Sequence, residues 1–166
     1  MKITERYEIH RMSYPFAKKL NPIIHDIILK NATIPDKGAI MTHWDRRDIK
    51  EFSLIFKWVE DFLIGVSQYQ RENLTLELNN LWGQLYNKGD YQDAHDHLPC
   101  HWSFVYYVNT PRGSSPLVFE QSKTKLHLKE GEVIIFPAWI RHYVPPNRCE
   151  ERSIVAGNIS YVKKGT

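Results

Sequence analysis

Apolar residues in the first half of the chain recur at helical spacing. Over residues 48–70 they recur at i, i+3, i+4 and i+7, which places them on one face of an amphipathic helix. A shorter helix is predicted to begin at Asn21-Pro22, with Asn21 as N-cap and Pro22 in the first helical position. We interpret residues 5–12 as an edge strand and residues 33–47 as irregular.

The second half of the chain changes to the pattern of short β-strands separated by turn residues. Strands are predicted at residues 75–87, 92–97, 101–109, 116–121, 124–128, 132–137, 141–145 and 151–162. Many short strands with regular turns are typical of a sandwich or barrel, a jelly roll included. The apolar face of the preceding helix needs a partner surface, and this sheet would supply it. We therefore expect a mainly β fold with supporting N-terminal helices.

Length and charge narrow the class of protein. A chain of 166 residues suits one domain, in which residues 1–74 supply supporting helices and an edge strand and residues 75–162 form the β core. The formal net charge is only +3 and the basic residues are spread along the chain, so no nucleic-acid partner is expected. Charged residues interrupt the longest apolar stretch, residues 53–66, so no membrane span is expected either.

Cysteine usage and the N-terminal sequence bear on the compartment. Cys100 and Cys149 are the only cysteines, too few for a disulfide framework in a domain of this size. The N-terminal segment shows no apolar stretch behind its charges, so no signal peptide is predicted. We expect a reducing, cytoplasmic location.

Three histidines are the strongest chemical signal in the sequence. His95 and His97 lie on a predicted strand, and because side chains alternate along a strand, the two imidazoles point to the same side. His142 follows the apolar strand 132–137, and a rolled sheet can bring it to the same mouth. Imidazole suits Fe, Zn, Cu or Ni. We predict that these three histidines ligate one metal ion.

Some alternatives for the metal ligands stay open at this point. Asp93 shares the predicted strand face with the histidine pair and would supply a carboxylate directly or through water, whereas Asp96 would do so only at a bulge. The triplet His43-Trp44-Asp45 has the His-x-Asp form of a facial triad, but a long helix follows it where sheet strands should come. We expect this triplet not to bind metal, and His10, His25 and His127 to be structural.

Several motifs resemble the Fe(II)/2-oxoglutarate-dependent oxygenases whose metal motif is His-x-His, and more distantly the prolyl hydroxylases. The motifs lie within residues 80–160, about half the chain: Trp82 to Asp90, His95 to His97, Tyr106 to Asn109, Phe136 to His142 and Arg152 to Asn158. The resemblance implies a double-stranded β-helix, the jelly-roll or cupin-like fold. It implies an enzyme that uses Fe(II), O2 and 2-oxoglutarate to hydroxylate a substrate, with decarboxylation of 2-oxoglutarate to succinate.

The resemblance also implies roles for individual side chains. His95, His97 and His142 would hold the iron. Arg152, ten residues after His142, would bind the distal carboxylate of 2-oxoglutarate, which suits a guanidinium because it pairs a carboxylate in two-pronged fashion and stays charged when buried. Further pocket residues implied in this way are Tyr107, which would hydrogen-bond the same carboxylate, Tyr86 and Asn158.

Two other functions fit the same pattern. Residues 89–97 and 131–142 nearly satisfy the two cupin motifs, although His101 stands near the place of the usual glutamate and Trp139 replaces a glycine. A cupin would use a three-histidine metal for dioxygenation or isomerisation without 2-oxoglutarate. A non-enzymatic jelly-roll binding protein would hold a metal for stability, in a site closed by a fourth ligand such as His101.

The substrate and the oligomeric state are less determined by the sequence. We expect a small-molecule or peptidyl substrate, reached through loops at residues 33–47, 98–100 and 110–115. The aromatic face of the long helix would serve a homodimer if it is exposed.

Overall fold

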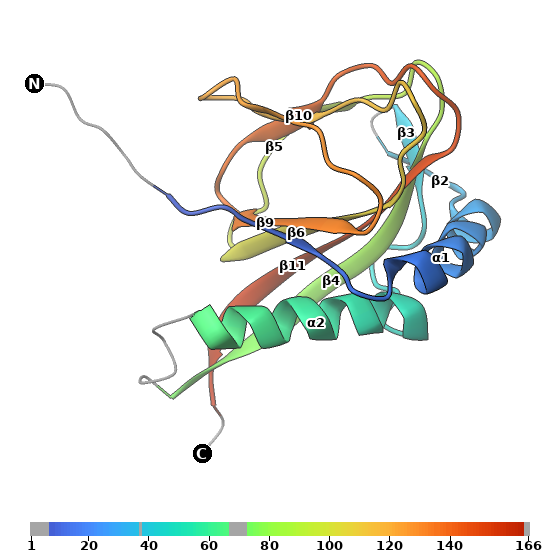
Figure 1. Cartoon of the computed structure of the whole chain (residues 1–166). Helices are drawn as coiled ribbons and strands as arrows, with labels where there is room; N and C mark the ends of the chain where they lie inside the picture. Colours follow the sequence, from blue (N-terminus) through green and yellow to red (C-terminus); the bar gives the residue numbers. More distant parts are fainter. Residues whose placement is uncertain (1–6, 37, 67–72, 165–166) are drawn as a thin grey trace, which may run out of the picture.

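The computed structural model describes residues 7–36, 38–66 and 73–164. Two antiparallel sheets pack face to face in this part of the chain (Figure 1). In chain order the elements are β1 (His10–Ser13), α1 (Ala17–Asn31), β2 (Ile34–Asp36), β3 (Ala39–Met41), α2 (Lys50–Val66), β4 (Leu74–Tyr86), β5 (Gln92–His95), β6 (Trp102–Asn109), β7 (Leu117–Phe119), β8 (Lys125–Leu126), β9 (Glu132–Pro137), β10 (His142–Val144) and β11 (Arg152–Lys163).

The strands of the two sheets are not arranged in chain order. The seven-stranded sheet, here called the major sheet, has the order β1-β9-β6-β11-β4-β3-β2, and the four-stranded minor sheet has the order β5-β10-β7-β8. β11 lies in the middle of the major sheet and pairs with β4 on one side and β6 on the other. The last strand in chain order, β11, is therefore the central strand of the major sheet.

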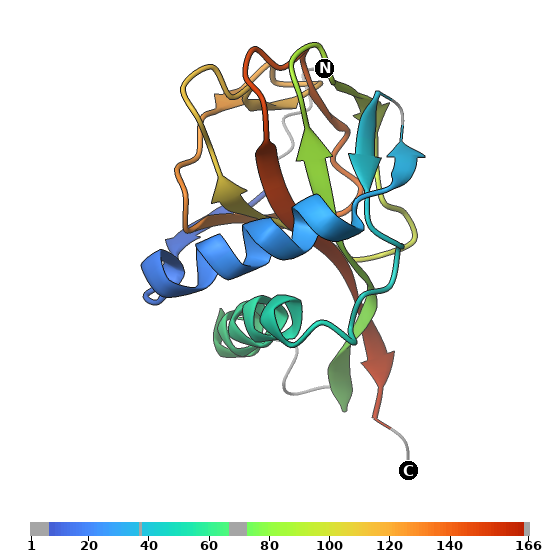
Figure 2. The ribbon, with the colours of Figure 1, turned by 90° about the vertical axis from the view of Figure 1, so that its right-hand side faces the viewer.

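Each face of the major sheet has its own apolar core. Figures 1 and 2 show α1 and α2 on the face of the major sheet that points away from the minor sheet. Strand alternation divides β6 between the two cores: Phe104 and Tyr106 pack toward the helices, whereas Val105 and Tyr107 face the minor sheet. The helices thus brace one face of the major sheet and leave the other free to build a cavity.

The sequence predicted the class of fold correctly. Each strand predicted between residues 75 and 162 has a counterpart in β4 to β11. The long helix is present as α2, although residues 67–70 of the prediction lie outside the described residues. The described part of the predicted edge strand contains β1, at one edge of the major sheet. In the described residues no helix is long and apolar enough to cross a membrane.

Two predictions in the first half were wrong. Helix α1 begins at Ala17 rather than at Asn21-Pro22, and Pro22 lies inside the helix. Asn21 does not cap the helix because its side chain is used in the core: Nδ2 donates to Val108 O at 2.8 Å, and Oδ1 accepts a hydrogen bond from Tyr106. Residues 33–47 are not irregular throughout, since β2 and β3 form a hairpin that extends the major sheet beside β4.

The contact between the helices and β4 gives a testable prediction about packing. A Cβ at Gly83 would lie 2.6 Å from Ile28 Cγ1 and 3.0 Å from Phe52 Cζ, so Gly83→Ala would overpack this core. We expect it to lower the free energy of unfolding by about 1–3 kcal/mol in urea denaturation. Gly65→Ala is the matched control, because no atom lies within 4 Å of the added Cβ in α2. The control should gain up to about 1 kcal/mol from helix propensity, and equal stability of the two variants would contradict the packing described.

Candidate functional site

A cavity of about 200 Å³ lies between the two sheets. Its major-sheet wall is built from alternate residues: Trp82 to Tyr86 on β4, Ser103 to Tyr107 on β6 and Arg152 to Asn158 on β11. The minor sheet contributes side chains from β5, β7 and β10. All seven residues that the sequence singled out as metal or pocket residues line this cavity: Tyr86, His95, His97, Tyr107, His142, Arg152 and Asn158.

Two of the histidines meet because their strands are neighbours. His95 on β5 and His142 on β10 are directly opposite each other in the antiparallel register, and their ring centroids lie 4.4 Å apart. Side chains at opposed positions of an antiparallel pair come within a few ångströms of each other. His97 completes the group, so that one ligand atom from each of the three imidazoles lies within 4.8 Å of the others.

His97 reaches this group by a different route from the one predicted. Strand β5 ends at His95, so strand alternation does not align His97 with it. Beyond β5 the chain bends toward the end of β9, and the His97 N–H donates to Ala138 O at 2.8 Å. The predicted strand 92–97 is therefore two residues too long.

Backbone carbonyls orient two of the three imidazoles. Nδ1 of His95 lies 2.7 Å from Asp93 O, and Nδ1 of His142 lies 2.9 Å from Ile140 O. A carbonyl can only accept, so each Nδ1 carries a proton, and in the neutral ring the lone pair lies on Nε2. Burial, followed by the neighbouring His95, lowers the pKa of His142 to about 3. His142 is therefore neutral at physiological pH, as a metal ligand must be.

The nearby carboxylates lie outside this histidine group. The Asp93 side chain is exposed and does not line the cavity. Asp96 does line it, but its carboxylate accepts from the Leu98 N–H at 3.2 Å and lies 3.8 Å from Arg141 Nη1. Among the described residues the group consists of three imidazoles without a carboxylate. Neutral imidazoles suit Fe, Zn, Cu or Ni, and three protein ligands leave coordination positions open.

His101 does not close the site as a fourth ligand. Its Nδ1 accepts a hydrogen bond from the Tyr161 N–H at 3.3 Å, and its ring packs on Tyr161 with the centroids 5.2 Å apart. His101 belongs neither to the histidine group nor to the cavity lining in the described part of the chain. A metal held by the three histidines alone would keep open coordination positions, unlike the closed four-ligand arrangement of structural sites.

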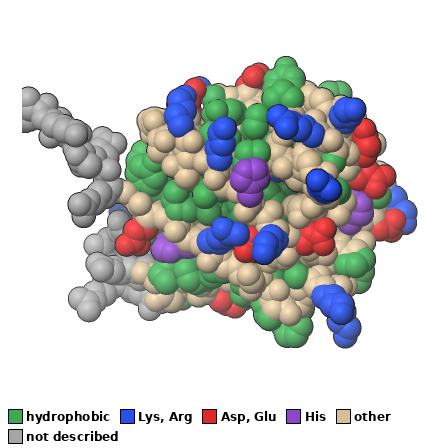
Figure 3. Space-filling model, turned by 45° about the horizontal axis from the view of Figure 1, so that its top comes forward, with side chains coloured by type: hydrophobic (Ala, Val, Ile, Leu, Met, Phe, Trp, Pro, Cys, Tyr) green, Lys and Arg blue, Asp and Glu red, His purple; other side chains and the backbone are tan. Residues whose placement is uncertain are grey.

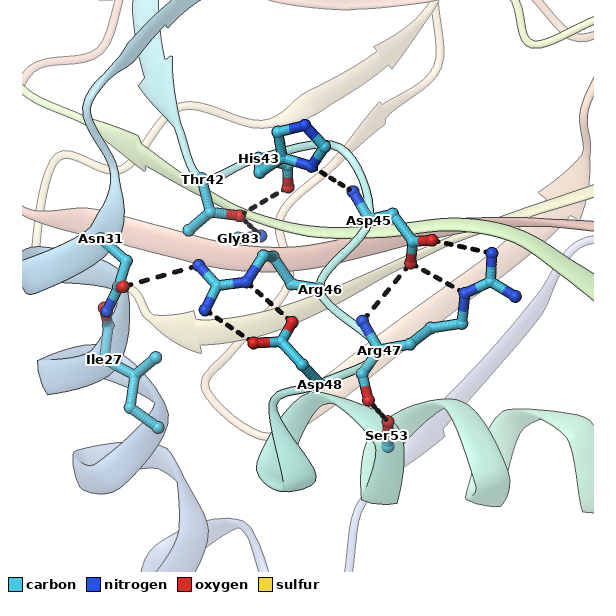
Figure 4. Close-up of polar contacts among 10 residues, drawn as sticks. All are labelled: Ile27, Asn31, Thr42, His43, Asp45, Arg46, Arg47, Asp48, Ser53 and Gly83. Atoms are coloured by element: carbon cyan, nitrogen blue, oxygen red, sulfur yellow. Dashed lines mark hydrogen bonds and ion pairs between the residues drawn. The ribbon is translucent and has the colours of Figure 1, made fainter.

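The His43-Trp44-Asp45 triplet has a structural role, as Figure 4 shows for its two outer residues. Nδ1 of His43 accepts a hydrogen bond from the Asp45 N–H, and the Asp45 carboxylate accepts two from the Arg47 guanidinium, each at 2.8 Å. The backbone of the same loop bonds to Leu81 on β4. Trp44, which sequence reasoning did not select, lines the cavity and contacts Trp82 with ring centroids 4.9 Å apart.

Arg152 lies at the far end of the cavity from Asn158 on β11. Its side chain is 1% exposed, and its Cζ lies 4.5 Å from the centre of the Tyr86 ring and 5.4 Å from that of Tyr107. Nε and Nη1 of Arg152 have no hydrogen-bond partner among the described residues, and neither has the Tyr107 hydroxyl. Burial raises the pKa of both phenols above the usual value, and Arg152 offsets part of that rise. The phenols are neutral donors beside a buried cation.

The buried guanidinium of Arg152 and the two neutral phenols beside it are suited to bind an anion. A buried charge is costly unless it is paired and hydrogen-bonded, and a guanidinium prefers the two-pronged partner that a carboxylate offers. Ile154 and Ala156 line the stretch between Arg152 and Asn158 on β11. The cavity therefore suits an elongated molecule with a carboxylate at one end and a metal-binding group at the other.

A second group of polar side chains was missed by the sequence reasoning. Gln84 Nε2 donates to Asp36 Oδ2 at 3.2 Å and to Gln92 Oε1 at 3.0 Å, and all three residues line the cavity. Strand alternation alone would have found Gln84, because it lies between Trp82 and Tyr86 on the same face of β4. Asp36 carries no such signal, since its position depends on the β2–β3 hairpin.

Comparison with solved structures identifies the fold. Viral collagen prolyl hydroxylase vCPH from Paramecium Bursaria Chlorella virus-1, in complex with 2-oxoglutarate, matches with a TM-score of 0.74 and 17% identity, over 93% of this chain and 96% of that chain. A prolyl-4-hydroxylase from Pseudomonas putida matches with a TM-score of 0.66 and 13% identity, over 96% and 94% of the two chains. HygX from Streptomyces hygroscopicus, with nickel, 2-oxoglutarate and hygromycin B bound, matches with a TM-score of 0.67 and 11% identity, over 93% and 83%.

These likenesses establish the fold. The chain has the double-stranded β-helix of the 2-oxoglutarate- and Fe(II)-dependent oxygenases, prolyl hydroxylases included, which confirms the predicted fold class. No protein-family profile matches the sequence. No curated protein matches it either.

The surface charges are mixed on the side of the molecule that Figure 3 shows. Lys and Arg side chains there are interspersed with Asp and Glu, and apolar side chains lie between them. A protein that tracks a nucleic-acid backbone usually carries its basic residues on one face or stripe. The charges visible on this face do not form such a stripe.

Proposed function

We propose that the protein is an Fe(II)- and 2-oxoglutarate-dependent oxygenase that hydroxylates a small molecule or a peptidyl side chain. The observation that carries the proposal is the buried guanidinium of Arg152, which has no carboxylate partner among the described residues and shares a cavity with three converging imidazoles. A 2-oxoglutarate molecule has the two ends that this cavity needs, a distal carboxylate for Arg152 and a keto acid for a metal.

The three histidines would hold the metal in this proposal. His95, His97 and His142 would supply imidazole nitrogen ligands, which Fe(II) accepts, and three ligands would leave room for a bidentate cosubstrate and O2. When bound, Fe(II) supplies the redox chemistry by which 2-oxoglutarate, O2 and a substrate C–H become succinate, CO2 and an alcohol. The reduction of O2 takes four electrons. The substrate C–H supplies two and the oxidative decarboxylation of 2-oxoglutarate supplies the other two, so no further reductant is needed.

The protein's own contribution is binding, orientation and exclusion of water. Arg152 and Tyr107 would fix the distal carboxylate, and Tyr86 supports the guanidinium through its ring face. Phe136 packs edge-on against His142 with ring centroids 4.8 Å apart and keeps that ligand in an apolar setting. Such fixed positions let the cosubstrate be held ready for reaction before the substrate arrives.

The cupin alternative explains less of this arrangement. A cupin-type dioxygenase or isomerase needs the metal site but gives no role to a buried arginine that lacks a carboxylate partner among the described residues. The non-enzymatic alternative needs a closed metal site, and His101 does not close this one. Neither alternative explains why the positive charge of Arg152 is buried in the same cavity as the histidines.

Thermal stability with selected ligands tests the proposed cosubstrate. At 100 times its Kd, 2-oxoglutarate should stabilise the metal-loaded protein by about 2.7 kcal/mol, seen as a higher Tm. Pyruvate is the matched control, because it keeps the keto acid and lacks the distal carboxylate. Equal effects of the two acids, or no effect of either, would count against the proposal.

Tyr107→Phe separates the phenol's hydrogen bond from its packing. Because the Tyr107 hydroxyl faces the cavity without a partner among the described residues, its removal should weaken 2-oxoglutarate binding about 10- to 100-fold, the effect of one hydrogen bond to a charged carboxylate. Tyr106→Phe is the matched control. Its hydroxyl donates to Asn21 on the helix side of the same strand, so stability should fall while the Kd for 2-oxoglutarate stays unchanged. An unchanged Kd in Tyr107→Phe would remove Tyr107 from the pocket's binding groups.

A further inference from the structure

His97 differs from the other two histidines in what contacts its ring. Backbone carbonyls fix the Nδ1 atoms of His95 and His142. Nδ1 of His97 lies 3.3 Å from Nδ2 of Asn158, a side-chain amide on β11. An amide, unlike a carbonyl, can turn either a donor or an acceptor toward the imidazole.

Asn158 is the centre of a chain of polar side chains across three neighbouring strands, in which Asn158 and Ser103 are buried and Asn80 is half-buried. Its Oδ1 accepts from Ser103 Oγ on β6 at 2.7 Å, and its Nδ2 donates to Asn80 Oδ1 on β4 at 2.7 Å. Both residues are its register partners in the major sheet. The Asn158 side chain is 4% exposed, so it is held in place from both sides, and an end-over-end turn of the amide is its remaining freedom.

The direction of the Asn158 amide decides which nitrogen of His97 carries the proton. With Nδ2 toward the ring, Nδ1 accepts a hydrogen bond and the proton lies on Nε2, which then has no lone pair for a metal. With the amide reversed, Oδ1 accepts a proton from Nδ1, and Nε2 is available. The reversal keeps the count of hydrogen bonds, because the Ser103 hydroxyl can also accept and the Asn80 amide can turn to donate.

We propose that Asn158, supported by Asn80 and Ser103, is a positioning residue that sets the tautomer and direction of His97, and that metal binding selects the arrangement with Oδ1 facing Nδ1. The inference rests on the proposed function only in taking the three histidines as metal ligands. A carboxylate at position 97 would bind through oxygen and have no tautomer to set. A residue that sets the tautomer, such as Asn158, is therefore required only when position 97 is a histidine.

Two variants of Asn158 test this role through metal affinity measured by chelator competition with Zn(II). Asn158→Leu removes both hydrogen-bonding groups and should weaken Zn(II) binding about 10- to 100-fold, the usual effect of losing a partner of a ligating histidine. Asn158→Asp offers only acceptors, so it should hold Nδ1–H and bind Zn(II) at least as tightly as the unchanged chain. Ser160→Ala is the control on the same strand, because its hydroxyl donates to Asn79 and not to the cavity.

Imidazole nitrogen NMR gives a readout that does not depend on activity, and its wild-type comparison does not depend on the stability of any variant. In the Zn(II)-loaded wild-type protein, long-range proton–nitrogen correlations should show His97 protonated at Nδ1. In the metal-free protein the proton should lie on Nε2, and Asn158→Asp should move it to Nδ1 without metal.

A Zn(II)-loaded wild type with Nδ1 of His97 unprotonated would overturn the role of Asn158, as would an Asn158→Leu variant with wild-type affinity. Either result would leave the proposed function standing. A wild-type protein that binds no divalent metal would instead overturn the proposed function, and this inference with it.

Discussion

Arg152→Met is expected to weaken 2-oxoglutarate binding strongly and at the same time to stabilise the ligand-free protein. Removing one partner of a buried charge pair costs about 2–5 kcal/mol, so the Kd for 2-oxoglutarate should rise at least about 30-fold. Without the ligand, Arg152 is a buried cation that lacks a carboxylate partner among the described residues. Replacing such a group with an apolar side chain of similar volume is neutral or stabilising by up to about 4 kcal/mol. Calorimetric titration and urea denaturation measure the two effects.

Two comparison variants make this prediction specific. Arg148→Met removes an exposed arginine four residues earlier in the same charged segment and should leave the Kd unchanged. Arg152→Lys keeps the charge but loses the planar fork and its stacking on Tyr86, so it should bind between wild type and Arg152→Met. If Arg152→Met bound 2-oxoglutarate as the wild type does, the guanidinium would not be the carboxylate receptor.

His142→Ala should have the second large effect, the loss of tight metal binding. His142 is 4% exposed and lies opposite His95 in the sheet, so its removal takes away one of three ligands and opens the wall beside Phe136. Losing an outer partner of a metal ligand costs about 10- to 100-fold in affinity, and losing the ligand itself should cost about 100-fold or more. Fe(II) affinity under anaerobic conditions, followed by competition with a chelator, measures this.

His101→Ala is the control for the loss of a histidine. His101 comes four residues after His97 in the sequence, yet its imidazole contacts Tyr161 outside the cavity. The control should bind Fe(II) as the wild type does. A similar loss of affinity in both variants would mean that His101 belongs to the metal site, as the closed-site alternative requires.

The sequence predicted most of the fold because its patterns are local. The apolar stripe of α2 and the turn residues between strands depend on near neighbours, and both predictions were correct. The start of α1 was missed because Asn21, a good N-cap by type, is needed for hydrogen bonds to β6. The hairpin of β2 and β3 was missed because it is stabilised by pairing with β4, which lies more than thirty residues further along the chain.

The candidate site was predicted from the spacing of residues along the predicted strands, which says nothing of residues beyond a strand end or of burial. His95 and His142 were found because both lie on strands, whereas His97 was found although the strand argument for it fails after His95. Neither spacing nor composition could show that Arg152 is buried, because its neighbours in sequence are charged. Burial follows from β11 lying at the centre of the major sheet, between β4 and β6.

Contacts between strands that are far apart in the chain could not be predicted from the sequence. Asn158 was expected to line the pocket, but its contact with His97 depends on the bend after β5 and on the register of β11. Trp44 lies in a loop that bonds to Leu81, and Asp36 lies in the unpredicted hairpin. Each of these residues acquires its place from long-range pairing, which a single sequence does not reveal.

Anaerobic titration of the Fe(II)-loaded protein with 2-oxoglutarate tests the central claim most directly, that one cavity holds a metal through three histidines and 2-oxoglutarate through Arg152. A weak visible metal-to-ligand charge-transfer band should grow and saturate at one equivalent, and it should be missing in Arg152→Met at the same concentration and in His142→Ala. No band in the wild-type protein, together with no rise in Tm on adding 2-oxoglutarate, would contradict the claim.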